Sequence, residues 1–173
     1  MKKNGNYVFI DSQNLNLGTV KDIYNKKKKL IYKGWKLDYK RFYRYLSDKF
    51  RAKKVFLFIG YIKENEGLYR YLKSCGYQLV YKPTVKDGLG KAKGNVDAEL
   101  VLYSAAIEFE NYDKAVIVSG DGDFYCLLKF LKERKKLLKL IIPNRVSAST
   151  LLSEFEDCKV FIQREKGKLE KEQ

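Results

Sequence analysis

The chain has 173 residues and a formal net charge of +15, from 36 lysines and arginines against 21 acidic residues. That length predicts one domain with a proper core, and no apolar run approaches the roughly 20 residues of a membrane span. Histidine is absent, which excludes the usual zinc sites and histidine-based acid–base or nucleophile systems.

The excess of positive charge predicts a polyanionic partner, and we favour nucleic acid over a membrane surface. No signal-peptide apolar region precedes the first strand-like run, so we expect a cytoplasmic protein. Cys75, Cys126 and Cys158 lie far apart without CxxC spacing. They predict reduced, mostly buried thiols.

Strand and helix patterns alternate along the chain. Apolar runs predict strands at about 6–11, 55–59, 77–81, 115–118 and 137–142, with an optional last strand at 160–162. Helical periodicity predicts helices at about 37–50, 64–75, 95–110 (with Asn95 as N-cap), 124–136 and 147–155. We expect a polar loop at 12–18 and a mobile basic loop at 83–94.

This alternation predicts one three-layer α/β/α domain around a mostly parallel, Rossmann-like sheet with strand order about 3-2-1-4-5. The domain is expected to span 1–163, with its core at 6–145 and a basic insertion at about 21–36. A charged, fraying tail is expected at 164–173.

Two carboxylates, Asp121 and Asp123, follow the fourth predicted strand in a glycine-containing turn. One of them could cap the next helix, but a cap needs only one oxygen. A metal or phosphoryl-transfer site therefore explains the pair better. Asp97, in the first turn of its helix, also has a simple alternative role in complementing the helix dipole.

The predicted winding places the switch point between the first and fourth strands. Four aspartates should meet there: Asp11, Asp97, Asp121 and Asp123. Such a cluster repels itself unless a cation neutralises it, and oxygen ligands select Mg²⁺ or Mn²⁺. With a basic surface around it, the cluster predicts phosphodiester hydrolysis by in-line attack of metal-activated water.

The basic insertion contains Lys26, Lys27, Lys28 and Lys29 in succession. A solvated or mobile loop and a nucleic-acid contact explain this run equally well. Tyr32 and Trp35 are either anchors of the loop or stacking platforms for bases.

Three segments resemble the NYN family, also called the LabA-like or DUF88 group, within the PIN-like nuclease superfamily: 9–14 (FIDSQN), 93–97 (KGNVD) and 118–124 (VSGDGDF). The resemblance implies a Mg²⁺- or Mn²⁺-dependent ribonuclease with the four aspartates as its acidic cluster. It also implies that Asn14 assists catalysis, and that Ser12, Asn14, Lys93 and Ser119 contact the substrate. Tyr103 stands where relatives commonly carry a further acid.

An endoribonuclease is the preferred function, with RNA favoured over DNA. The alternative is a catalytically weak or inactive RNA-binding or regulatory module on the same fold. A nucleotide-binding or small-phosphate enzyme is weaker, because no GxGxxG follows the first strand and the Walker spacing fails around 88–91. The sequence leaves the oligomeric state open, with a homodimer among the options.

Overall fold

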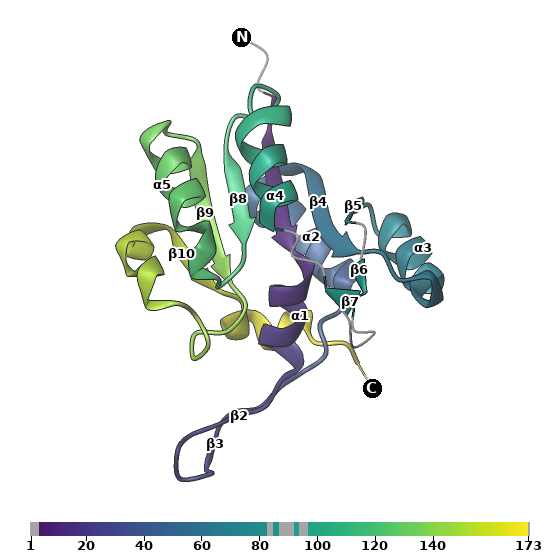
Figure 1. Cartoon of the computed structure of the whole chain (residues 1–173), viewed down its shortest axis with the longest axis vertical. Helices are drawn as coiled ribbons and strands as arrows, with labels where there is room; N and C mark the ends of the chain where they lie inside the picture. Colours follow the sequence, from purple (N-terminus) through teal and green to yellow (C-terminus); the bar gives the residue numbers. More distant parts are fainter. Residues whose placement is uncertain (1–3, 83–84, 87–91, 94–96, 173) are drawn as a thin grey trace.

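The computed structural model of the protein describes residues 4–82, 85–86, 92–93 and 97–172, with strands and helices alternating along the chain (Figure 1). The strands are β1 (Asn6–Asp11), β2 (Ile23–Tyr24), β3 (Leu30–Tyr32), β4 (Ala52–Gly60), β5 (Gln78–Lys82), β6 (Val85–Lys86), β7 (Ala92–Lys93), β8 (Ala115–Val118), β9 (Leu137–Ile142) and β10 (Lys159–Phe161). The α-helices are α1 (Ser12–Val20), α2 (Tyr39–Phe50), α3 (Glu66–Ser74), α4 (Asp97–Leu102), α5 (Tyr125–Glu133) and α6 (Lys166–Leu169). Short 3₁₀ segments are η1 (Lys63–Asn65), η3 (Gly122–Phe124), η4 (Thr150–Cys158) and η5 (Ile162–Glu165), and η2 (Tyr103–Ile107) is a π-helix.

The central sheet has six strands in the order β10-β9-β8-β1-β4-β5, and every pairing in it is parallel. The predicted strand order is therefore confirmed, and the optional last strand joins the sheet beyond β9. β1 lies between β4 and β8, with Ile10 opposite both Leu57 and Val118. The carboxyl ends of β1 and β8 thus lie side by side, which is the switch point the winding predicts.

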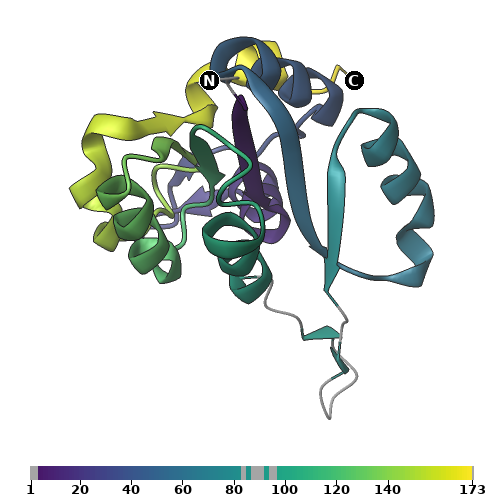
Figure 2. The same ribbon diagram turned by 90° about the horizontal axis from the view of Figure 1, so that it is seen from above.

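Side chains alternate between two cores on opposite faces of the sheet. Phe9 and Ile117 belong to the core covered by α4, α5 and η4, whereas Ile10 and Val118 belong to the core covered by α1, α2 and α3. Figure 2 shows the two helical layers on either side of the sheet. Strands buried on both faces explain why the sequence shows continuous apolar runs rather than alternation.

The polar loop predicted at 12–18 is wrong, because these residues form helix α1. The Asp11 side chain caps the helix by accepting a hydrogen bond from the Asn14 N–H at 3.0 Å. At the other end, the buried side chain of Asn144 donates to the carbonyl of Gly18 at 3.1 Å. Only Leu15 among the large apolar residues of the helix is buried. The helix is therefore stabilised by its cap and its docking, and hydrophobic periodicity cannot reveal it.

The helix predicted at 95–110 is described from Asp97 onward, and its expected cap, Asn95, lies outside the described residues. Its second half is π-helical, over Tyr103–Ile107. A π-turn holds more residues than an α-turn and rotates the following side chains around the axis. Helical periodicity over 95–110 predicts that Leu100 and Ile107 share the buried face; Leu100 is buried, but Ile107 is 51% exposed and Ser104 is buried.

Part of the predicted mobile basic loop at 83–94 forms a short antiparallel pair, in which Val85 faces Lys93 and Lys86 faces Ala92. The other residues of this loop, 83–84, 87–91 and 94, lie outside the described part of the chain. The helix predicted at 147–155 is the 3₁₀ segment η4, which begins later, at Thr150.

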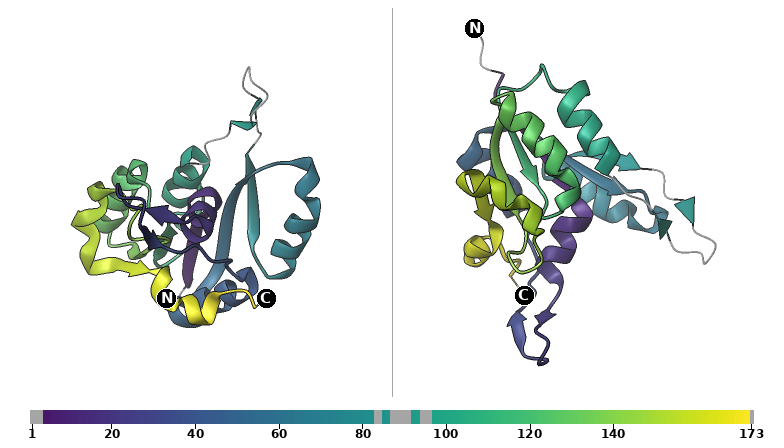
Figure 3. Two further views of the ribbon diagram at one scale, coloured as in Figure 1. Left: turned by 90° about the horizontal axis from the view of Figure 1, so that it is seen from below. Right: turned by 60° about the vertical axis from the view of Figure 1, so that its left-hand side comes forward.

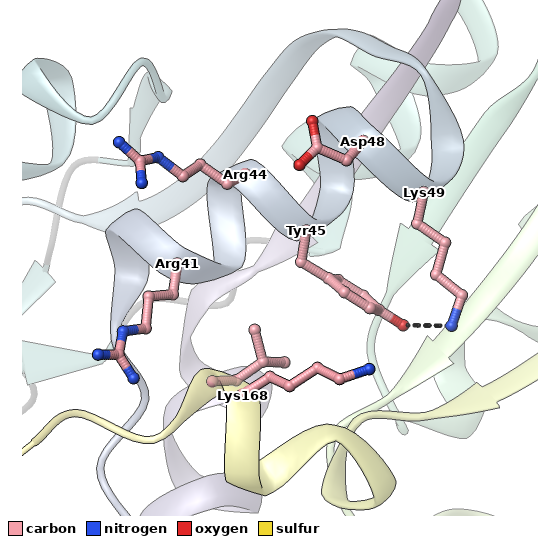
Figure 4. A pocket seen from close by; sticks show the side chains of 7 residues that line it. Arg41, Arg44, Tyr45, Asp48, Lys49 and Lys168 are labelled. Atoms are coloured by element: carbon pink, nitrogen blue, oxygen red, sulfur yellow. Dashed lines mark hydrogen bonds between the residues drawn. The ribbon is translucent and has the colours of Figure 1, made fainter.

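The charged segment after Arg164, predicted to fray, instead packs against α2. Leu169 is 2% exposed, and its carbonyl accepts a hydrogen bond from the Asp38 N–H at 2.8 Å. Figure 4 shows the groove between α2 and α6, where Lys49 donates to the hydroxyl of Tyr45 at 3.1 Å. One buried leucine and main-chain hydrogen bonds hold the segment in place. The prediction that it frays was based on its charge, which indicates neither of these contacts.

The thiols are less buried than predicted. All three cysteines are free, but only Cys158 is buried, while Cys75 is half-buried and Cys126 is exposed on α5. Within the described part of the chain, no helix combines the length and apolar character needed to cross a membrane.

Candidate acidic active site

The turn after β8 places two aspartates at the carboxyl edge of the sheet. Asp121 Oδ1 accepts a hydrogen bond from the Asp123 N–H at 3.0 Å and so caps η3. Asp121 is half-buried and Asp123 is exposed. One oxygen of Asp121 therefore caps the following helix, as predicted. Capping does not need the other carboxylate oxygens of the turn.

Asp11 ends the neighbouring strand β1 and is only 4% exposed. Its Oδ1 accepts the Asn14 N–H at 3.0 Å, and its Oδ2 accepts the Ser119 hydroxyl at 3.2 Å. Burial raises the pKa of Asp11, and the negative charges of Asp97 and Asp121 raise it further, while the two hydrogen bonds lower it. A buried carboxylate can remain at such a position because both its oxygens have partners.

Ser119 and Asn14 connect the ends of β1 and β8. The Ser119 hydroxyl oxygen accepts the Asp121 N–H at 3.1 Å while its proton is donated to Asp11. Asn14 Oδ1 accepts the Gly120 N–H at 2.7 Å, and the Gly120 carbonyl accepts the Ser149 N–H at 3.0 Å. The turn after β8 is thus held by Asn14 of α1 on one side and by Ser149 of the loop after β9 on the other.

Asp97, at the start of α4, completes the cluster. Asp97, Asp121 and Asp123 each offer one carboxylate oxygen, and these three oxygens lie within 4.8 Å of one another. Asp11 is not part of that triad, but it is close enough to Asp97 and Asp121 for their charges to raise its pKa. The four aspartates predicted from the sequence are therefore neighbours at one edge of the sheet, although 110 residues separate Asp11 from Asp121.

An open cavity of about 300 Å³ lies beside the turn. It is lined by Asn14, residues 120–123, Ser147, Ser149 and Leu151. The two serines come from the loop after β9 and were not predicted from the sequence. Gly122 is needed for this contact, since a Cβ there would lie 2.4 Å from the Ser149 hydroxyl oxygen. The available signal was the Pro143-Asn144 pair, which turns the chain at this same carboxyl edge.

Other predicted substrate contacts lie outside the cavity. Ser12 is the half-buried first residue of α1, directly after Asp11. Lys93 is on β7, and its side chain lies outside the described part of the structure. Lys26, Lys27, Lys28 and Lys29 form the turn between β2 and β3, which projects from the body of the molecule (Figure 3). Tyr32 and Trp35 are buried at its base and are anchors, not stacking platforms.

Tyr103 does not join the acidic cluster, although it stands where relatives commonly carry a further acid. Its ring packs edge-on against Phe56 and Phe58, with ring centroids 5.8 and 5.5 Å apart. Tyr103 therefore belongs to the core between α4 and the sheet.

The donor set fits a hard divalent cation. Carboxylate oxygens are the ligands that Mg²⁺ and Mn²⁺ prefer, and three of them are already close enough to share one ion. Within the described ranges, no lysine or arginine forms an ion pair with Asp11, Asp121 or Asp123. A bound cation would relieve the mutual repulsion of these carboxylates.

This sheet order and acidic cluster define the class of PIN-like nucleases. The NYN domain model matches residues 6–163, which is nearly the whole chain, and the protein belongs to the NYN domain family. The crystal structure of a protein of unknown function from Vibrio parahaemolyticus has the same fold, with a TM-score of 0.66 and 20% sequence identity over 94% of this chain and 95% of that one. Among curated proteins no match was found.

Proposed function

We propose that this protein is a divalent-metal-dependent endoribonuclease. One observation carries the proposal: Asp97, Asp121 and Asp123 bring three carboxylate oxygens within 4.8 Å of one another, beside an open cavity in a chain of net charge +15. A protein that only binds polyanions gains nothing from a negative pocket, because that pocket repels the ligand.

Each part of the site has a role in this proposal. Asp97, Asp121 and Asp123 would hold a Mg²⁺ or Mn²⁺ ion, with Asp11 as a fourth oxygen ligand. A divalent cation bound there would neutralise phosphate charge and lower the pKa of an attacking water. Ser119 and Asn14 orient the acids, since their hydrogen bonds are made within the protein. The open cavity leaves room for a phosphodiester.

Positive charge around the site would hold the nucleic acid. We propose that Ser12, Lys93 and the four lysines of the β2–β3 turn contact the RNA, as the sequence predicts. Lysine acts as a point charge toward phosphates, so these contacts would be sequence-independent. Preference for RNA over DNA would require a contact to the 2′-hydroxyl.

A cleavage assay with the full chain tests the function. Labelled single-stranded RNA, duplex RNA and single-stranded DNA are incubated with Mn²⁺, Mg²⁺ or EDTA. We expect internal cleavage of RNA with either metal, none in EDTA, and none by the Asp121→Asn variant. Asp48→Asn is the matched control, because Asp48 is an exposed aspartate of α2, which packs on the other face of the sheet from α4.

Metal binding needs a readout that does not depend on cleavage. Titration with Mn²⁺ should raise the melting temperature of the wild type and of Asp48→Asn, but not that of Asp121→Asn, because only a ligand that binds the folded state stabilises it. Undiminished cleavage in EDTA would refute the proposal. RNA binding without cleavage under any metal would favour the regulatory module instead.

A further inference from the structure

The β2–β3 hairpin projects from the body of the molecule (Figure 1). Ile23 pairs with Tyr32 and Tyr24 pairs with Leu30, in antiparallel register. The hairpin follows α1, which itself begins at the carboxyl end of β1, so it extends from the same edge of the sheet as the acidic cluster (Figures 1 and 3).

The base of the hairpin is fixed to the body. Tyr32 is buried, and its hydroxyl donates to the carbonyl of Thr19 at 3.1 Å. Asp22 Oδ1 accepts the Gly34 N–H at 2.8 Å. Gly34 approaches the end of α1 so closely that a Cβ there would lie 2.0 Å from the Val20 carbonyl oxygen. The hairpin is therefore a positioned arm rather than the mobile loop that its lysines alone would predict.

The tip of the arm is also ordered by hydrogen bonds. Asn25 Oδ1 accepts the N–H groups of Lys27 and Lys29 at 2.9 and 3.0 Å, and the Asn25 N–H donates to the Lys29 carbonyl at 2.9 Å. Lys28 adopts a left-handed conformation with φ of 57°. Four exposed lysines are thus held on one tight turn, and residues 23–37 contain no acidic residue.

Next to these lysines the arm exposes apolar side chains. Tyr24 is 57% exposed, and Leu30, directly opposite it across the strand pair, is 41% exposed. Ile31 is 48% exposed. Single exposed apolar residues need no explanation, but a ring beside four cations on a fixed arm matches the chemistry of single-strand binding, in which bases stack on aromatic rings and cations follow the backbone.

The groove between α2 and α6 provides a useful contrast, because it is also lined by cations (Figure 4). There, Arg41 pairs with Glu172, and Lys49 and Lys168 share Glu165, each at 3.1 Å. Most of its positive charge is therefore already neutralised locally. The acid closest in sequence to the tip of the β2–β3 arm is Asp22 at its base, which pairs with Lys33 at 2.9 Å and lies 3.5 Å from the Tyr24 hydroxyl. Among the described residues, Lys26–Lys29 form no ion pair.

We propose that the β2–β3 hairpin is a nucleic-acid binding site separate from the acidic cluster, in which an unpaired base stacks on Tyr24 while Lys26–Lys29 bind the adjoining phosphates. The identity of the ligand rests on the proposed function, but binding at the arm does not require cleavage. A second copy of this chain is a poorer occupant, because two such arms would bring eight lysines together. A single-stranded nucleic acid fits both features, because its phosphates can bind the lysines and its unpaired bases can stack on the ring.

Binding is measured by fluorescence anisotropy in EDTA, with a labelled single-stranded RNA, the matched RNA duplex and heparin, a polyanion without bases. Tyr24→Leu removes the ring and Tyr24→Phe retains it. Tyr71→Leu is the matched control, because Tyr71 is a 44% exposed tyrosine on α3, away from the arm. A fourth variant replaces all four lysines of the tip with glutamine, and circular dichroism checks that each variant is folded.

We expect Tyr24→Leu to bind the single strand about fivefold or more weakly, which corresponds to one lost base stack. Tyr24→Phe and Tyr71→Leu should bind it like the wild type, and heparin and duplex binding by Tyr24→Leu should be unchanged. The lysine variant should bind all three ligands more weakly, with a shallower dependence on salt, by about 0.7 in the log–log slope per lost phosphate contact on the single strand.

Equal affinity of Tyr24→Leu and the wild type for the single strand would overturn the inference. An equal loss of affinity of Tyr24→Leu for all three ligands would also overturn it, because the ring would then only support the turn. Sedimentation of the wild type as a dimer that Tyr24→Leu converts to a monomer, with RNA binding intact, would also overturn it. These outcomes are distinct from failure of the nuclease proposal, because no cleavage occurs in EDTA.

Discussion

Removing the Ser119 hydroxyl should weaken both the fold and the proposed metal site. In Ser119→Ala, Asp11 Oδ2 and the Asp121 N–H each lose a partner, at 3.2 and 3.1 Å. Ser119 is 1% exposed, so water cannot easily replace the hydroxyl. At about 0.5–1.5 kcal/mol for each hydrogen bond, the free energy of unfolding should fall by about 1–3 kcal/mol. For a chain of this size, each kcal/mol lowers the melting temperature by about 2–4 °C.

The same substitution should lower the affinity for Mn²⁺ by about 10- to 100-fold, as is typical when a group that orients metal ligands is removed. Thermal unfolding in EDTA measures the first effect, and calorimetric titration with Mn²⁺ measures the second. Ser104→Ala is the control: Ser104 is also buried, but its hydroxyl donates to the Leu100 carbonyl within a helix, where the loss is nearly neutral. If Ser119→Ala resembles Ser104→Ala in both measurements, Ser119 does not position the acids.

Two further substitutions test separate parts of the structure. Asp11→Asn should abolish cleavage but stabilise the metal-free protein at neutral pH. Burial raises the pKa of Asp11, so its carboxyl group holds a proton more tightly in the native state than in the unfolded state. The wild type therefore loses stability as the pH rises through that raised pKa, and the neutral asparagine does not. Urea unfolding in EDTA should therefore show a higher free energy of unfolding for the variant than for the wild type at pH 7, and this difference should disappear near the ordinary aspartate pKa of 3.8. Equal free energies of unfolding at pH 7 would contradict this account of Asp11. Gly34→Ala should lower the free energy of unfolding by about 1–3 kcal/mol, because its Cβ would overlap the Val20 carbonyl. Gly67→Ala, on α3 with open space around it, should instead stabilise the protein by about 0.5–1 kcal/mol, and equal effects of the two substitutions in chemical unfolding would refute the role given to Gly34.

The sheet could be predicted because its central strands β1, β4 and β8 are buried on both faces and appear as apolar runs. Once the strand order follows, the winding alone places Asp11 beside the turn that holds Asp121. Helix α1 could not be predicted in this way, because it depends on a side-chain cap from Asp11 and a hydrogen bond from Asn144, 126 residues away from Gly18.

The roles of the polar residues around the acids also could not be predicted from the sequence. The resemblance to the NYN family implied that Asn14 and Ser119 contact the substrate, whereas the structure shows their side chains bonded to the Gly120 and Asp121 main chain and, for Ser119, to Asp11. A motif conveys which residues are present, but not which atoms are already occupied. The Ser147–Ser149 loop carries no motif at all, and only its contact with Gly122 reveals it.

The two hydrogen bonds of the Gly120 peptide also bear on when the site can exist during synthesis. Its N–H is held by residue 14 and its carbonyl by residue 149. A nascent chain that has not yet extruded residue 149 from the ribosome cannot complete this arrangement. Assembly of the acidic turn is therefore a late event in folding, and a chain truncated before Ser149 would lack the contact that holds the Gly120 carbonyl.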